Sequence, residues 1–126
     1  IPGVFTPVTI GGREYVDGGL VAPIPVRAAR GLGADVVVAV DISSRPSGKT
    51  KAGNLDLLLD TIAIMGGALG KTELAAADVL IRPELRGLPA TNFQQRHEAI
   101  LEGEKAGFAA IARVREAIAT WERKHP

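Results

Sequence analysis

The apolar and polar positions at the start of the chain predict a β-hairpin. Residues 8–10 (Val-Thr-Ile) and 13–16 (Arg-Glu-Tyr-Val) are separated by Gly11 and Gly12. A two-residue glycine turn between two strand-like runs is a strong hairpin signal, because glycine accepts the positive φ angles that such turns need. The second run leads directly into Asp17, so we expect the hairpin to aim this carboxylate.

The following stretch predicts a strand–helix–strand unit. Residues 26–30 fit a short helix that Gly31 or Gly33 ends. Residues 35–42 form a continuous apolar run that is too short for a helix and rich in β-branched side chains. Such a run is typical of a strand buried on both faces. Together with the strand at 13–16, these elements predict a βαβ unit.

The second half of the chain predicts two longer helices and one short strand. Asn54 can cap a helix with regularly spaced apolar positions, and Gly66-Gly67 should weaken or bend it. Residues 78–82 predict a strand that Pro83 ends. Residues 94–123 predict an amphipathic helix that closes the core. Its apolar stripe comprises Leu101, Phe108, Ile111, Val114, Ile118 and Trp121.

Composition narrows the functional classes. With 126 residues, 46% of them hydrophobic, the chain corresponds to one domain or less. A net charge of +1, without any basic stripe, argues against nucleic acid as a partner. The absence of cysteine excludes disulfides and thiolate chemistry, and the two histidines are too far apart for a zinc motif. We therefore expect no metal and no cofactor, and no segment is apolar enough to cross a bilayer.

Two aspartates follow predicted strands and are the candidate carboxylates. Asp17 precedes Gly18 and Gly19, which can turn the chain sharply through positive φ angles and leave the carboxylate projecting. Asp-Gly-Gly is also ordinary turn chemistry, so a purely capping role for Asp17 stays open. Asp41 is followed by Ile-Ser-Ser, and we expect it to accept hydrogen bonds from its own loop.

Other candidate motifs fail on spacing or context. Residues 66–72 resemble a phosphate loop, but Met65 stands where the pattern needs glycine and a helix precedes it. These glycines mark a helix bend or a close contact instead. His97 is expected on a solvent-facing helix surface, and His125 in a disordered polar tail. Ser43, like the other loop serines, is not in a Gly-x-Ser-x-Gly motif.

The first 43 residues carry a set of closely spaced motifs. The motifs are Pro2-Gly3-Val4-Phe5, Tyr15-Val16-Asp17-Gly18-Gly19, Pro23-Ile24-Pro25-Val26, Leu32-Gly33-Ala34-Asp35 and Val38-Ala39-Val40-Asp41. Together they closely resemble the C-terminal half of bacterial patatin-like phospholipases, and a looser likeness continues through residues 77–83 and the closing helix.

The resemblance implies a fold and an activity. The implied fold is a three-layer α/β structure with a mostly parallel sheet flanked by helices, of which residues 1–126 are the C-terminal portion. Patatin-like enzymes are serine acyl hydrolases with a Ser-Asp dyad, and the dyad aspartate of the family maps onto Asp17. The active-site loop is then Gly18-Gly19. The nucleophilic serine and the oxyanion loop belong to the N-terminal half, and this sequence has neither.

The implied function is that of a lipid acyl hydrolase, phospholipase A or lysophospholipase in type. Its partners would be a phospholipid or other acyl ester and the missing N-terminal half of the same domain. Partial burial of Asp17 would raise its pKa and suit it to act as a base. The alternative is a non-catalytic α/β module for interaction or small-molecule binding. The sequence leaves the compartment, contact with a membrane surface and homodimerisation open.

Overall fold

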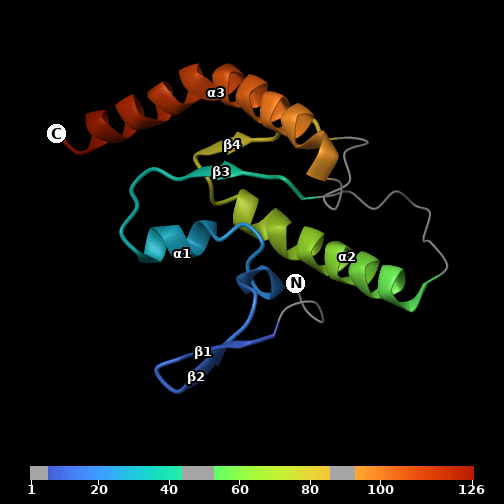
Figure 1. Ribbon diagram of the computed structural model, residues 1–126. Helices are drawn as coiled ribbons and strands as arrows, with labels where there is room; N and C mark the ends of the chain where they lie inside the picture. The colour runs from blue at the N-terminus through green and yellow to red at the C-terminus, as the bar shows by residue number, and fades with distance from the viewer. Residues whose placement is uncertain (1–5, 44–52, 86–92) are drawn as a thin grey trace.

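The computed structural model describes residues 6–43, 53–85 and 93–126, and it places helices on both sides of a small parallel sheet (Figure 1). Helices α1 and α2 lie on one side of strands β3 and β4, and α3 lies on the other. The fold is therefore of the expected α/β class. In chain order the elements are β1 (Val8–Ile10), β2 (Arg13–Tyr15), the 3₁₀ helix η1 (Gly18–Leu20), α1 (Val26–Gly31), β3 (Val38–Val40), α2 (Asn54–Leu74), β4 (Val79–Ile81), the 3₁₀ helix η2 (Phe93–Gln95) and α3 (Arg96–Lys124).

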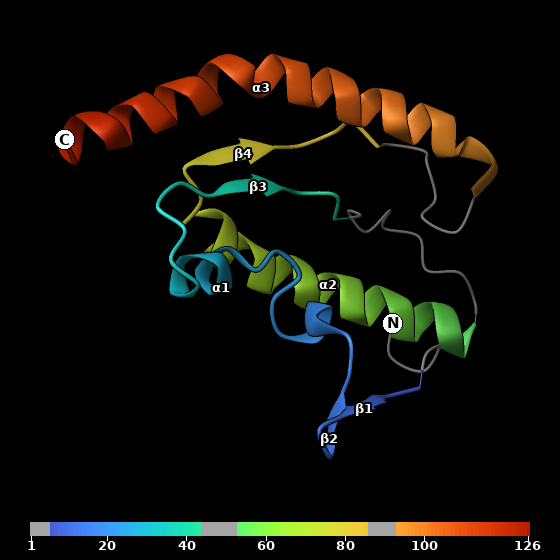
Figure 2. The same cartoon turned by 60° about the vertical axis from the view of Figure 1, so that its left-hand side comes forward.

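The predicted hairpin is present and projects away from the layers (Figure 2). Strands β1 and β2 pair antiparallel, and Gly11 and Gly12 have φ angles of 57° and 76°. Among the described residues, β2 pairs with β1 alone, while β3 pairs in parallel with β4. The predicted βαβ unit beginning at residues 13–16 is therefore wrong. The parallel connection runs instead from β3 through α2 to β4.

Helix α1 ends where the sequence predicted, through a left-handed glycine. Gly33 has a φ angle of 95°, and its amide donates to the carbonyl of Arg30 at 2.9 Å. The amide of Ala34 donates to the carbonyl of Ala29 at 3.1 Å. This pair of bonds is a Schellman motif, which satisfies the last helical carbonyls and reverses the chain.

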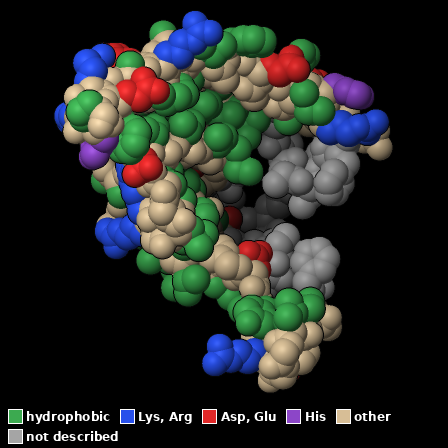
Figure 3. Space-filling model, turned by 90° about the vertical axis from the view of Figure 1, so that its left-hand side faces the viewer, with side chains coloured by type: hydrophobic (Ala, Val, Ile, Leu, Met, Phe, Trp, Pro, Cys, Tyr) green, Lys and Arg blue, Asp and Glu red, His purple; other side chains and the backbone are tan. Residues whose placement is uncertain are grey.

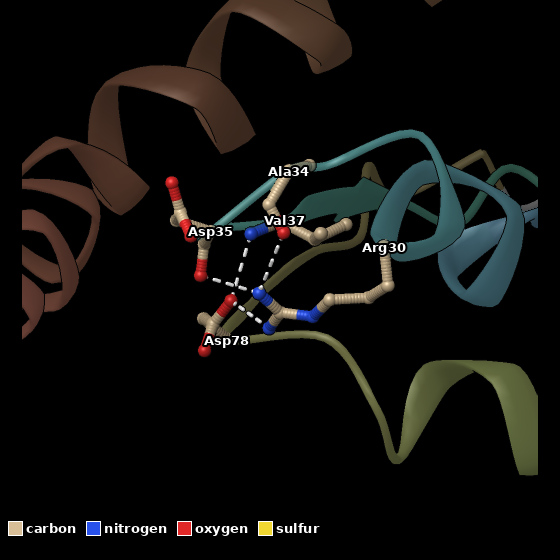
Figure 4. A network of polar contacts seen from close by, with 5 residues as sticks. All are labelled: Arg30, Ala34, Asp35, Val37 and Asp78. Atoms are coloured by element: carbon tan, nitrogen blue, oxygen red, sulfur yellow. Dashed lines mark hydrogen bonds and ion pairs between the residues drawn. The ribbon is translucent and has the colours of Figure 1, made fainter.

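Arg30 and Asp78 join the loop before β3 to the start of β4 (Figure 4). The Arg30 guanidinium donates to the carbonyls of Ala34 and Asp35 and forms an ion pair with Asp78. The Asp78 carboxylate also accepts the amide of Val37 at 2.7 Å. The Val37 amide, followed by Arg30, lowers the pKa of Asp78 against the opposing effect of burial. These contacts fix where the two parallel strands begin.

Helix α2 continues through the paired glycines without interruption. Gly53 rather than Asn54 occupies its N-cap position, so the predicted cap is displaced by one residue. A Cβ on Gly66 would lie 3.5 Å from Pro23, and one on Gly70 would lie 3.9 Å from a methyl group of Ile24. Gly66 and Gly70 therefore lie at van der Waals distance from the 23–24 segment, whereas a Cβ on Gly67 would meet no described atom within 4 Å. The predicted bend is wrong, because the helix runs unbroken through both glycines.

The core is small and lies between the sheet and helices α1 and α2. It consists of the buried side chains of Ile24, Val26, Val37 and Ala39, with Leu74, Ala77 and Leu80 partly buried around them. On the other face of β3, Val38 and Val40 are exposed. The expectation of a strand buried on both faces is therefore wrong for the described structure.

Helix α3 contacts β4 and buries Ala110, but most of its apolar stripe is exposed. Phe108, for example, is 73% exposed, so the expectation that this helix closes the core is wrong. A helix of 29 residues is about 43 Å long. The strands of the sheet lie only about 5 Å apart, so two strands are too narrow to cover the apolar stripe of such a helix. Hydrophobic side chains accordingly gather on the surface that Figure 3 shows. No described helix is long and apolar enough to span a membrane.

Candidate functional site

Asp17 lies at the junction between the hairpin and the short helix η1. Its Oδ1 atom accepts a hydrogen bond from the amide of Gly19 at 2.8 Å, which makes Asp17 the N-cap of η1. The residue itself is exposed, so the carboxylate faces solvent at the end of β2. The local structure thus combines the two features expected from the sequence, a projecting carboxylate and a turn cap.

The glycines after Asp17 act differently from the expectation. The described glycines with positive φ are Gly11, Gly12 and Gly33, so the predicted positive φ at Gly18 and Gly19 is wrong. The chain turns there through a 3₁₀ helix, whose φ angles are negative. Gly19 is favoured instead by a close approach, because a Cβ would lie 3.1 Å from Asp17 Oδ1 and the carboxylate would have to shift slightly. A Cβ on Gly18 would have no neighbour within 4 Å.

The pKa of Asp17 is lowered, which is opposite to the sequence expectation. The largest cause is a hydrogen bond from the α-ammonium group at the start of the chain, followed by the Gly19 amide. Burial opposes the shift only weakly, because the described residues leave Asp17 exposed. The ammonium contribution needs a free amino group, whereas the Gly19 amide is part of the loop. Asp17 is therefore a carboxylate at neutral pH.

Asp41 follows β3 and is held far more firmly than Asp17. Only 6% of the residue is exposed. The amide of Ser43 donates to Oδ1 at 3.0 Å and its hydroxyl donates to the same atom, as expected for an aspartate bonded within its own loop. Arg82, which follows β4, adds hydrogen bonds to Oδ2. Burial alone would raise the pKa of Asp41, but the Ser43 donors and Arg82 outweigh it and lower the pKa.

Arg82 is the polar residue at this sheet end that the sequence analysis missed. The signal for it was present, because an arginine stands directly after the strand at residues 79–81 and before Pro83. In the parallel register Val40 lies opposite Ile81, so Asp41 and Arg82 are the next residues on the two strands.

The remaining candidates take structural positions. Residues 66–72 lie inside α2 rather than between a strand and a helix, which agrees with the rejection of a phosphate loop. His97 is exposed in the first turn of α3. His125 stacks on Trp121 with ring centroids 4.7 Å apart, so its expected disorder is wrong. Ser44 and Ser47 lie outside the described residues. The described part of the chain contains no cluster of three residues suited to holding a metal ion.

Comparison with known proteins supports the resemblance noted in the sequence. Residues 1–30 match the protein family described as Patatin-like phospholipase. An uncharacterized NTE family protein of Mycobacterium bovis is 35% identical over 51 residues, which are 40% of this chain and 14% of that protein. Uncharacterized NTE family proteins from two strains of Mycobacterium tuberculosis match with the same identity and coverage.

The extent of these matches sets what they establish. The matched segment spans about one seventh of the length of these relatives. The match therefore shows similarity of this segment and does not show the activity of a whole protein. The family match includes the hairpin and the loop of Asp17, Gly18 and Gly19. The resemblance is therefore confirmed for the segment that carries Asp17, which is similar to patatin-like phospholipases over residues 1–30.

Proposed function

We propose that this chain forms the C-terminal portion of a patatin-like lipid acyl hydrolase and supplies the aspartate of a Ser-Asp dyad. The observation that carries the proposal is the position of Asp17, an exposed carboxylate within the family-matched residues 1–30. The family match supports lipid hydrolysis at a coarse level. The dyad and the phospholipase A or lysophospholipase type are our inference from the resemblance.

The serine and the oxyanion donors would come from another part of the same domain. In this proposal the serine belongs to a Gly-x-Ser-x-Gly segment at a strand-to-helix turn. The exposed sheet face at Val38 and Val40 and the exposed stripe of α3 offer apolar surface that such a part could cover. Covering the Asp17 loop would also remove water from the carboxylate and raise its pKa from the lowered value described above.

The proposed chemistry is a two-step acyl transfer. Asp17 accepts the serine Oγ proton as the oxygen attacks the ester carbonyl, and backbone amides stabilise the resulting oxyanion. The tetrahedral intermediate then expels the alcohol, which takes the proton from Asp17, and an acyl-enzyme remains. Water then attacks the acyl-enzyme as Asp17 takes its proton, and that proton passes to the serine Oγ as the C–Oγ bond breaks and the fatty acid is released. The negative charge of Asp17 at neutral pH supplies the required proton acceptor.

The alternative is a non-catalytic α/β module in which Asp17 only caps η1. One observation favours it: Asp17 Oδ1 already accepts the Gly19 amide at 2.8 Å. The two roles separate chemically, because asparagine caps a helix about as well as aspartate but cannot accept a proton in this pH range. Asp17→Asn therefore removes the proposed base and keeps the cap.

The experiment uses the whole protein, meaning the polypeptide that carries this chain and the proposed serine segment. We expect Asp17→Asn to lower turnover of a short-chain p-nitrophenyl ester about 10³-fold with an unchanged melting temperature. Asp35→Asn is the matched control, since Asp35 is an exposed aspartate in the loop before β3. Wild-type turnover by Asp17→Asn, or no esterase activity in the wild-type protein, would contradict the proposal.

A further inference from the structure

Arg82 lies at the edge of the parallel sheet where α/β proteins bind ligands. It follows β4 directly, and Asp41 follows β3 at the same level of the register. The amide of Asp41 donates to the carbonyl of Ile81 at 2.9 Å, which continues the ladder to this point. In open parallel sheets, ligands are bound outside the carboxyl ends of the strands. Arg82 therefore lies at the end of the sheet where open α/β sheets bind ligands.

Among the described residues, the Arg82 guanidinium bonds to Asp41, which uses only part of it. Its Nε atom donates to Asp41 Oδ2 at 2.8 Å, and Nη2 lies 2.7 Å from the same oxygen. A guanidinium has five N–H donors, so three remain, two on Nη1 and one on Nη2. One of these on Nη1 and the one on Nη2 point side by side along the end of the planar group that does not contact Asp41, which is its outward edge. The side chain of Arg82 is 45% exposed, whereas that of Asp41 is 6% exposed.

The buried carboxylate holds this guanidinium in a defined orientation. Asp41 is itself fixed by the Ser43 amide and hydroxyl, so the plane of Arg82 is set by a residue that cannot move freely. Ordering the arginine in advance reduces the entropy that a ligand would otherwise lose on binding. A purely structural ion pair needs only the side of the guanidinium that faces Asp41. Within the described parts of the chain, the outward edge is then available to a second anion.

We propose that Arg82 binds a phosphate group through this outward edge, with Asp41 as its positioning residue. The planar fork of two parallel N–H donors matches the spacing of two phosphate oxygens. Within the proposed function the phosphate is that of a phospholipid head group, and this identification rests on the proposed function. The phosphate site itself rests on the geometry of Arg82 and does not involve Asp17.

The test observes Arg82 directly. The Nε–Hε resonance of Arg82 in the ¹⁵N-labelled protein is followed during titration with inorganic phosphate and, separately, with glycerophosphocholine, a soluble phosphodiester head group. Sodium chloride at matched ionic strength is the control for screening. We expect a saturable shift with a phosphate compound and none with chloride. A shift that chloride reproduces, or no shift with either phosphate compound, would overturn the proposal.

The two ligands and two variants sharpen this result. Saturable binding of glycerophosphocholine assigns the site to a lipid head group, whereas binding of inorganic phosphate alone assigns it to free phosphate. Arg82→Lys keeps a cation beside Asp41 but loses the fork, so we expect its affinity for phosphate to fall at least about fivefold. Arg115→Gln removes an exposed arginine on α3 and should bind as the wild type does. Equal affinity in Arg82→Lys and wild type would contradict bidentate binding.

Because wild-type Arg82 is itself the reporter, the decision does not depend on a variant that folds. A loss of hydrolase activity in Asp17→Asn leaves this titration unaffected, and a negative titration leaves the role of Asp17 untouched. The two proposals can therefore fail separately.

Discussion

Two aspartates follow strands in this molecule, and their surroundings are opposite. Asp17 is exposed and leads from β2 into η1, with Gly19 as a close amide donor. Asp41 is buried at the end of β3 and is surrounded by the donors of Ser43 and Arg82. A carboxylate that is buried and bonded at both oxygens serves structure or orients a neighbour. An accessible carboxylate can still meet a reacting group.

This contrast explains why a position directly after a strand does not identify which of the two aspartates is the candidate catalytic base. Both residues stand after strands in the sequence, and the pKa of each is lowered. The difference lies in access, because a general base must come within hydrogen-bond reach of the proton that it abstracts. We therefore expect substitutions at Asp17 to change chemistry and substitutions at Asp41 to change stability.

The largest expected effect on stability belongs to Asp41. Asp41→Asn should lower the free energy of unfolding by about 2 kcal/mol, because it weakens charge-assisted bonds at a buried site and leaves Arg82 without its anion. Urea denaturation of the variant measures this loss. Asp17→Asn is the counterpart and should leave the urea midpoint unchanged, since the cap is retained. Equal midpoints for Asp41→Asn and wild type would remove the contrast.

A smaller effect is expected at the glycines beside Asp17. Gly19→Ala places a Cβ 3.1 Å from Asp17 Oδ1 and should displace the carboxylate. In the whole protein we expect kcat/KM for a short-chain ester to fall about tenfold, because catalysis is sensitive to small misplacements. Gly18→Ala is the matched variant and should lose less activity, as its Cβ meets no described atom within 4 Å. The reverse ranking would argue against the described loop geometry.

The smallest effect concerns stability in acid. The folded-state pKa values of Asp41 and Asp78 are both lowered, so their contribution is complete above the ordinary aspartate pKa of about 4. It is lost as the pH falls from there through the lowered values. Melting temperatures between pH 6 and pH 2 should therefore fall most steeply below about pH 4. Asp41→Asn and Asp78→Asn should each flatten that fall, and an unchanged slope in both would refute this linkage.

Local signals in the sequence predicted much of the fold. The Gly11-Gly12 turn predicted the hairpin, Gly33 the end of α1, and the spacing of apolar residues the long helices. Each of these depends on conformational limits or periodicity within a short stretch. Strand partners depend on distant residues instead, and for this reason the sequence did not reveal that β2 remains outside the parallel sheet.

The candidate site was predictable only in part, for the same physical reason. The identity of Asp17 and its glycines followed from local sequence. The exposure of Asp17 depends instead on what packs against the loop, and the sign of its pKa shift on the hydrogen bonds that the carboxylate accepts. The expectation of partial burial assumed strands packed around it, whereas β2 belongs to a projecting hairpin. Arg82 was missed because its contact with Asp41 depends on the register between β3 and β4, which local sequence does not reveal.

The most direct test of the central claim is the rate at which a fluorophosphonate labels the proposed serine in the whole protein, measured against pH. Labelling reports activation of the serine without requiring lipid binding. We predict that the wild-type labelling rate falls as the pH drops through the pKa of Asp17. Asp17→Asn should react at least about 100-fold more slowly, and its rate should not show this fall at acidic pH. An Asp17→Asn variant with the wild-type rate and pH profile would contradict a dyad that depends on Asp17.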